Sequence, residues 1–162
     1  VRWHMIGHLQ TNKVKYIIDK VSMIHSVDSY KLAAEINKRA AACGITMDIL
    51  LQVNSAQEES KFGISTEETE GLIMQILDSC ENIRIRGLMC IAPYADDPED
   101  IKKYFDSVKE QYDQFSTIDH PNLDFRYLSM GMSHDFPVAI EAGSNLVRVG
   151  SAIFGERDYS KV

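Results

Sequence analysis

The feature that most constrains the fold of this chain is a regular alternation of short apolar runs with segments of helical periodicity. The apolar runs cover residues 3–9, 21–27, 47–53, 83–91, 127–133 and 146–155. The run 47–53 is almost continuously apolar, which is typical of a strand that is buried on both faces. Strands that alternate with helices pair in parallel through right-handed crossovers, so the sequence predicts an α/β fold with about six strands.

Helices are predicted between these runs. The clearest covers residues 30–43, with Asp28 or Ser29 as its N-cap and Gly44 just past its end. Near the C-terminus, Ser133 is predicted to cap a helix over residues 134–142. The other predicted helices cover residues 13–18, 65–82 and 98–115.

Two architectures share this order of elements, namely a doubly wound open sheet and a closed (β/α)8 barrel. No G-x-G-x-x-G motif opens a helix, which lowers the case for a dinucleotide-binding sheet. A closed barrel needs eight units and about 200 residues or more, so about two units are too few here. Either the sheet is open, or the domain over residues 1–162 is a barrel that lacks its first two β/α units. The chain starts with Val1 and not with Met, and a strand is already predicted from Arg2 onward, so residues before Val1 are expected to be missing.

The composition excludes several classes of protein. With 17 basic and 24 acidic residues the net charge is −7, which argues against nucleic acid as the main partner. The three cysteines form no C-x-x-C pair, so neither a disulfide framework nor a zinc site is expected, and a reducing compartment fits. No run approaches the roughly 18 apolar residues that cross a bilayer, so no membrane partner is expected.

The last two apolar runs end in glycine and serine, which predicts an anion site. Ser129 and Ser133 belong to the first run, and Gly150 and Ser151 belong to the second. In (β/α)8 barrels the loops after the last two strands frequently bind phosphate. Arg148 lies inside the second run, and two interpretations of it stay open. It either forms an ion pair with a carboxylate of a neighbouring strand or contacts a ligand at the end of its own strand.

Other polar residues are weaker candidates. The five histidines form no metal-binding pattern, and His25 is interpreted as a packed strand residue. Asn54 ends a strand, and its amide could reach a ligand. Lys61 follows in the next loop, where it is either a solvated lysine or a residue of the barrel mouth.

Four segments carry a resemblance to a known family: WHMIGHLQTNK, LLQVN followed by EESKFGI, IRIRGLMCIAPY, and LSMGMSHDFPVAIEAGSNLVRVGSAIFGERDY. The chain resembles the YggS/PROSC family of pyridoxal 5′-phosphate-binding homeostasis proteins along its whole length. That family is similar to the N-terminal barrel of bacterial alanine racemase. The resemblance therefore implies an incomplete (β/α)8 TIM barrel of this type, with about six of eight units present and the cofactor at the C-terminal ends of the strands.

The resemblance also implies roles for individual residues. Arg148 would face the pyridine nitrogen of the cofactor, and because a guanidinium does not give up its proton, that nitrogen would stay largely unprotonated. Gly150, Ser151 and Ser129 would hold the phosphate, with Ser133 as a second serine. The remaining implied contacts are Met130 and Met132 near the phosphate, and His4 and Asn54 nearer the ring. The role of Lys61 stays open.

One departure from the family is important. The resembling proteins carry the Schiff-base lysine on their first strand, in a segment like A-V-S-K-T, and a G-E-N-Y segment on the second; neither occurs here. No catalytic residue is therefore assigned. We expect this chain to hold the cofactor, or a phosphate or sulfate ion in its place, without a covalent bond.

The function implied by the resemblance is pyridoxal 5′-phosphate homeostasis in the cytoplasm: binding the cofactor, buffering it and delivering it to apo-enzymes that depend on it, with no robust turnover. The alternative is an amino-acid racemase-like enzyme of the same fold, which would need a second base such as a tyrosine from another domain. A third possibility is a partial barrel that binds nothing. We expect the intact protein to be a monomer and this shorter chain to self-associate through its open side.

Overall fold

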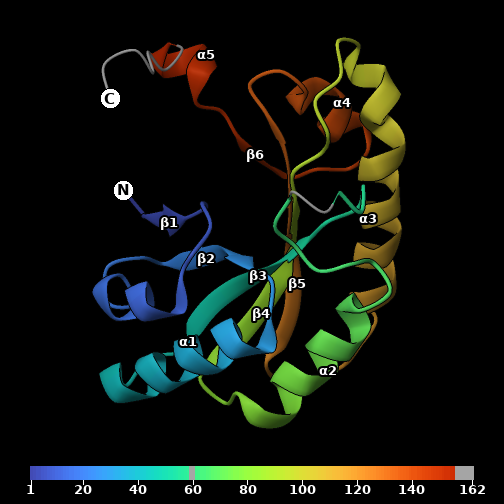
Figure 1. The fold of residues 1–162 in the computed structure, drawn as a ribbon. Helices are drawn as coiled ribbons and strands as arrows, with labels where there is room; N and C mark the ends of the chain where they lie inside the picture. The colour runs from blue at the N-terminus through green and yellow to red at the C-terminus, as the bar shows by residue number, and fades with distance from the viewer. Residues whose placement is uncertain (59–60, 156–162) are drawn as a thin grey trace.

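The computed structural model describes residues 1–58 and 61–155, and these form one layer of parallel strands covered by helices (Figure 1). The strands are β1 (His4–Met5), β2 (Met23–Val27), β3 (Met47–Val53), β4 (Ile83–Cys90), β5 (Leu123–Met132) and β6 (Leu146–Arg148). The helices are η1 (Thr11–Tyr16), α1 (Tyr30–Cys43), α2 (Thr69–Ser79), η2 (Pro98–Ile101), α3 (Lys102–Phe115), α4 (Phe136–Glu141) and α5 (Ser151–Phe154), where η marks a 3-10 helix. The last residues of the C-terminal motif, 156–159, lie outside the described residues.

The strand order decides between the two predicted architectures. All five neighbouring pairs are parallel, and the spatial order β1-β2-β3-β4-β5-β6 follows the chain. In a doubly wound sheet the order of the strands reverses at a switch point, so later strands are added at the other edge. In a barrel each new strand is added next to the preceding one. The sheet therefore curls into a half-barrel, which confirms the prediction of an incomplete barrel (Figure 1). Within the described residues, β1 and β6 each pair with one strand only.

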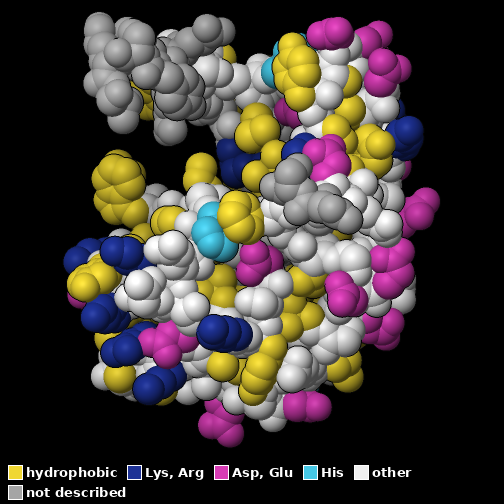
Figure 2. Space-filling model, in the orientation of Figure 1, with side chains coloured by type: hydrophobic (Ala, Val, Ile, Leu, Met, Phe, Trp, Pro, Cys, Tyr) yellow, Lys and Arg dark blue, Asp and Glu magenta, His cyan; other side chains and the backbone are white. Residues whose placement is uncertain are grey.

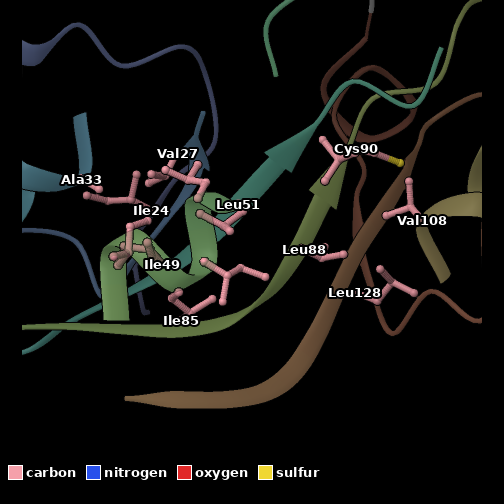
Figure 3. Close-up of a cluster of buried hydrophobic side chains, with 14 of the residues drawn as sticks. Ile24, Val27, Ala33, Ile49, Leu51, Ile85, Leu88, Cys90, Val108 and Leu128 are labelled. Carbon is pink, nitrogen blue, oxygen red and sulfur yellow. The ribbon is translucent and has the colours of Figure 1, made fainter. Parts of the chain in front are cut away.

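The core has two parts, because successive side chains of a strand point to opposite faces. The larger part lies between the sheet and the helices, where Ala33 of α1 and Val108 of α3 meet the strands (Figure 3). The smaller part fills the inside of the curl with Met23, Leu50 and Met89. Burial on both faces explains why the strands read as continuous apolar runs.

The predicted helix 30–43 is confirmed with both of its ends. The Ser29 hydroxyl accepts a hydrogen bond from the Leu32 amide at 3.4 Å, and Gly44 ends the helix in the left-handed conformation, at a φ of 67°. In contrast, α2 begins later than residue 65, because the Ser65 hydroxyl and Glu68 bond to each other in a preceding turn. The run 146–155 is not one strand either, since β6 ends at Arg148 and α5 begins at Ser151.

On the face seen in Figure 2, basic and acidic side chains concentrate in different areas. Lys and Arg side chains gather over the η1 and α1 side, whereas Asp and Glu side chains are spread over the α2 and α3 side (Figure 2). No helix among residues 1–58 and 61–155 has the length and apolar character that a membrane span requires. The same residues contain no cluster of His, Cys, Asp or Glu that could hold a metal ion.

Candidate functional site

Arg148, at the end of β6, points into the curl of the half-barrel. Its Nη1 donates to the backbone oxygen of Ser129 at 2.8 Å and to the hydroxyl of Ser129 at 2.7 Å, and its Nη2 donates to the Cys90 carbonyl at 2.8 Å. Among the described residues Arg148 has no carboxylate partner within salt-bridge distance, so the predicted ion pair is not found there. Burial lowers the pKa of Arg148, but a guanidinium stays charged at any physiological pH. The site therefore keeps a positive charge held by neutral oxygens.

Two histidines extend this arrangement across the inside of the curl. His25 on β2 is 1% exposed, and its Nδ1 lies 3.2 Å from the hydroxyl of Ser129 on β5. Its Nε2 lies 3.0 Å from Nδ1 of His4 on β1. Burial, followed by the charges of His4 and Arg148, lowers the pKa of His25 from 6.5 to about 3, so its ring is neutral. Burial also lowers the pKa of His4, with a smaller contribution from Arg2.

A cleft opens beside these groups, between the first and the last strand of the sheet. Its volume is about 390 Å³, which is within the range of small-molecule sites. It is lined by Arg2, His4, Ile6, His25 and residues 146–150. Because β1 and β6 are the two edges of the sheet, both the cleft and its opening depend on how the sheet curls.

Ser133 connects the ends of the last two strands. Its hydroxyl accepts hydrogen bonds from the amides of Gly150, at 3.1 Å, and Ala152, at 3.2 Å. The prediction that Ser133 caps the following helix is wrong. The helix begins at Phe136 because Pro137 presets the backbone of its first turn, and Asp135 occupies the cap position. The Asp135 carboxylate accepts from the Met132 amide at 2.6 Å, which closes the turn after β5.

A second hollow adjoins this connection. It has a volume of about 420 Å³ and is lined by Tyr94, His134, Ser133, Ser151 and Ala152. The rings of Tyr94 and His134 stack with their centroids 5.4 Å apart. The structure thus brings Arg148, Gly150, Ser151, Ser133 and Ser129 to neighbouring strand ends, as their positions in the sequence predicted.

Three further candidate residues, like Ser129, Ser133 and Ser151, do not line the cleft between β1 and β6. The Asn54 side chain bonds within its own loop, to the backbone oxygens of Glu58 at 2.9 Å and Lys61 at 3.4 Å. Lys61 donates to the Ala92 carbonyl at 3.2 Å and lies 3.4 Å from the Glu58 carboxylate. Met130 is fully buried and belongs to the core between sheet and helices, on the face of β5 opposite to Ser129.

The residues around the cleft fit pyridoxal 5′-phosphate chemically. Arg148 supplies a fixed positive charge, and the ring of His4 supplies a polar edge. Ile6, Leu146 and Val149 supply apolar surface for an aromatic ring. Nothing lies within 4 Å of the position that a Cβ would take on Gly150, so a ligand can approach the backbone at that glycine.

The curled sheet and the polar ends of its last strands define a barrel of the alanine racemase N-terminal type. The chain belongs to this family, since residues 1–158 match the family model "Alanine racemase, N-terminal domain". Among curated relatives, the pyridoxal phosphate homeostasis protein of Aquifex aeolicus is 46% identical over 98% of this chain, and the human protein of that name is 37% identical over 99%. The chain spans 68% of the length of the Aquifex protein and 60% of the human one.

Solved structures agree with this assignment. PipY of Synechococcus elongatus, solved with PLP bound, has a TM-score of 0.83 and 30% identity, with 96% of this chain and 71% of PipY covered. An unknown protein from Bifidobacterium adolescentis has a TM-score of 0.89 and 39% identity, with 95% of this chain and 61% of that one covered. Alanine racemase of Clostridium difficile, at 16% identity and a TM-score of 0.68, covers 100% of this chain with 42% of its own length and shares the fold.

The site residue that the sequence reasoning did not select is His25, which it assigned to packing. His25 is two residues from Met23, so both side chains point to the inner face of the curl. This two-residue spacing was the feature of the sequence that could have placed His25 on the inner face. Its partner Ser129 is 104 residues away in the chain, so the pattern within β2 could not reveal the contact.

Proposed function

We propose that this chain binds pyridoxal 5′-phosphate and is the larger part of a protein that serves the homeostasis of this cofactor. The intact protein buffers the cofactor in the cytoplasm and delivers it to apo-enzymes that require it, without robust turnover of its own. The observation that carries the proposal is the buried Arg148, which three neutral oxygen contacts hold beside a cleft of ligand size. The names of the curated relatives and the PLP bound to PipY support the choice of ligand.

Each part of the ligand has a counterpart in the chain. Arg148 would face the ring nitrogen, and because a guanidinium does not give up its proton, the ring would remain a poor electron sink. When bound, pyridoxal 5′-phosphate supplies an aldehyde and an electron-withdrawing ring. Gly150 and Ser151, with Ser133, would hold the phosphate, whereas Ser129 is fully buried and its hydroxyl bonds to Arg148. The amides of Gly150 and Ala152, which Ser133 now engages, are donors of the kind that bind phosphate.

The racemase alternative has weaker support. The alanine racemase neighbour is 16% identical, and this likeness concerns the fold alone. The proposal therefore treats the protein as a carrier of the cofactor. A racemisation assay with L-alanine on the full-length protein separates the two, because sustained turnover would favour the enzyme.

The proposal is tested by titrating the chain with pyridoxal 5′-phosphate and following ligand absorbance and protein fluorescence. We expect saturable, reversible binding that inorganic phosphate weakens. After treatment with borohydride, intact-mass and peptide analysis should show no stoichiometric adduct at any single lysine. Absence of saturable binding would contradict the proposed function, whereas a stoichiometric adduct would contradict only the expectation that binding is non-covalent.

A further inference from the structure

We propose that Arg148 orients a chain of hydrogen bonds that ends at His4, whose Nε2–H group is thereby fixed as a donor to the cleft. The intermediate members of this chain are Ser129 and His25, so His25 acts as a positioning residue. The chain crosses the inside of the half-barrel from β6 to β1 by way of β5 and β2.

The direction of the first bond follows from the chemistry of arginine. A guanidinium has only donors, so the 2.7 Å contact from Arg148 Nη1 makes the Ser129 hydroxyl oxygen an acceptor. Ser129 is fully buried, and its own hydroxyl proton needs an acceptor. Among the described residues, the other side-chain neighbour of this hydroxyl is Nδ1 of His25, at 3.2 Å. The Ser129 proton therefore points to His25 Nδ1.

The second bond follows from the first. A neutral imidazole carries one proton, and if Nδ1 of His25 accepts, the proton is on Nε2. This nitrogen lies 3.0 Å from Nδ1 of His4, so His25 donates and His4 accepts. His4 in turn carries its proton on Nε2. His4 lines the cleft, and no hydrogen-bond partner of its Nε2 is found among residues 1–58 and 61–155.

Protonation of either histidine would disturb this order. A second proton on His4 would place two N–H groups against each other at the His4–His25 contact. A second proton on His25 would add a buried charge near Arg148. The charged groups that face the pair are Arg2 and Arg148. The two arginines oppose a further positive charge, in line with the lowered pKa of both histidines.

The consequence concerns the ligand that the cleft accepts. A fixed N–H donor beside a guanidinium favours a ligand atom with a free lone pair or negative charge, such as a ring oxygen, an aldehyde oxygen or an unprotonated ring nitrogen. A ligand that presents an N–H group there would place this donor against the N–H donor of His4, and no hydrogen bond would form. The assignment of this ligand as pyridoxal 5′-phosphate rests on the proposed function, whereas the hydrogen-bond chain itself does not.

The proposed chain of hydrogen bonds is tested without ligand by nuclear magnetic resonance of the imidazole nitrogens in the wild-type protein. Long-range ¹H–¹⁵N correlation distinguishes a protonated from an unprotonated nitrogen in each ring. We expect both His25 and His4 to be the Nε2–H tautomer. His8, which stacks on Phe62 and does not belong to this chain of hydrogen bonds, is the internal reference. A proton on Nδ1 of His25 would overturn the proposal. This outcome would leave the proposed function intact.

A second test separates positioning from packing. Ser129→Thr keeps the hydroxyl and Ser129→Ala removes it, so we expect the single tautomer of His25 to persist in the first variant and to be lost in the second. Affinity for pyridoxal 5′-phosphate should fall about tenfold in Ser129→Ala and in His4→Phe, as for the loss of one hydrogen bond. His4→Gln, which restores an N–H donor, should recover part of this loss. Equal affinities of His4→Phe and His4→Gln would contradict the donor role of His4.

Discussion

At the scale of single residues, the site depends on a buried cation that is hydrogen-bonded to neutral oxygens and has no carboxylate partner among the described residues. An unpaired buried charge is costly, and most proteins offset it with a carboxylate. Arg148 instead bonds to the Ser129 and Cys90 carbonyls and to a hydroxyl. These contacts stabilise the guanidinium while leaving its positive charge available to an anionic or electron-rich ligand.

Replacing Arg148 by alanine tests this role. In Arg148→Ala we expect affinity for pyridoxal 5′-phosphate to fall by about 10- to 100-fold, the range of a lost charge-assisted hydrogen bond. The free energy of unfolding should fall by about 1–3 kcal/mol, because two buried carbonyls lose their donors. Fluorescence titration and urea unfolding measure both quantities. Arg126→Ala is the matched control, since Arg126 lies on β5, is exposed and pairs with Asp124. Unchanged affinity in Arg148→Ala would refute the assignment of Arg148.

His25 makes stability depend on pH. Its pKa falls from 6.5 to about 3 on folding, so below pH 6.5 the unfolded chain binds a proton that the folded chain does not. Stability is therefore fully present above pH 6.5 and decreases as the pH falls toward 3, at up to about 1.4 kcal/mol per pH unit. Urea unfolding between about pH 5 and 6.5 measures this effect together with that of His4, whose pKa burial also lowers. The pKa of carboxyls such as Asp124, lowered by Arg126, lies below this window. In His25→Phe the free energy of unfolding should depend less steeply on pH. An unchanged slope would contradict the assignment of this pH dependence to His25.

At the scale of elements, the ends and bends of the strands were less predictable than the strands themselves. The runs 47–53 and 30–43 became β3 and α1 with the predicted bounds, because their apolar periodicity and caps are local. β5 begins at Leu123, ahead of the predicted residue 127, and pairs there with Ile85 through a backbone irregularity. No local pattern marks that irregularity, since it results from the fit of β4 to β5.

Gly87 is the residue that permits this fit. It has a φ of 140°, and a Cβ on it would overlap the carbonyl oxygen of Tyr127 on β5. We expect Gly87→Ala to lower the free energy of unfolding by at least about 3 kcal/mol, since neither backbone can yield without breaking the ladder. Gly44→Ala is the control, because Gly44 also has a positive φ but open space around its Cβ position. That variant should cost about 1 kcal/mol. Similar losses in urea unfolding would contradict the steric explanation.

At the scale of the whole molecule, the two edges of the sheet remain open within the described residues. The edge at β1 exposes Trp3 and Ile6, and the edge at β6 exposes Val147 and the adjoining Phe154 of α5. Unpaired strands next to exposed apolar side chains promote association. These features support the expectation that this chain self-associates through its open side.

Sedimentation velocity over a range of concentrations tests the expected self-association. We expect a concentration-dependent dimer or larger species for the wild-type chain. Trp3→Lys should shift the distribution toward monomer, because it places a charge at the open edge. Met74→Lys serves as the control, since Met74 is an exposed apolar residue on α2, away from both edges. A monomer at all concentrations, or equal effects of the two variants, would refute association through this side.

The sequence by itself determined the alternation of strands and helices, their parallel pairing, and the polar ends of the last two strands that hold Ser133, Gly150 and Ser151. These features follow from periodicity and from the turn chemistry of neighbouring residues, which act over a few positions. The tertiary structure alone decided that Ser129 lies beneath Arg148, that His25 contacts it from 104 residues away, and that Asn54 remains in its own loop. Those contacts depend on the angle through which the sheet curls. That angle arises from the packing of all six strands, and no local stretch of sequence encodes it.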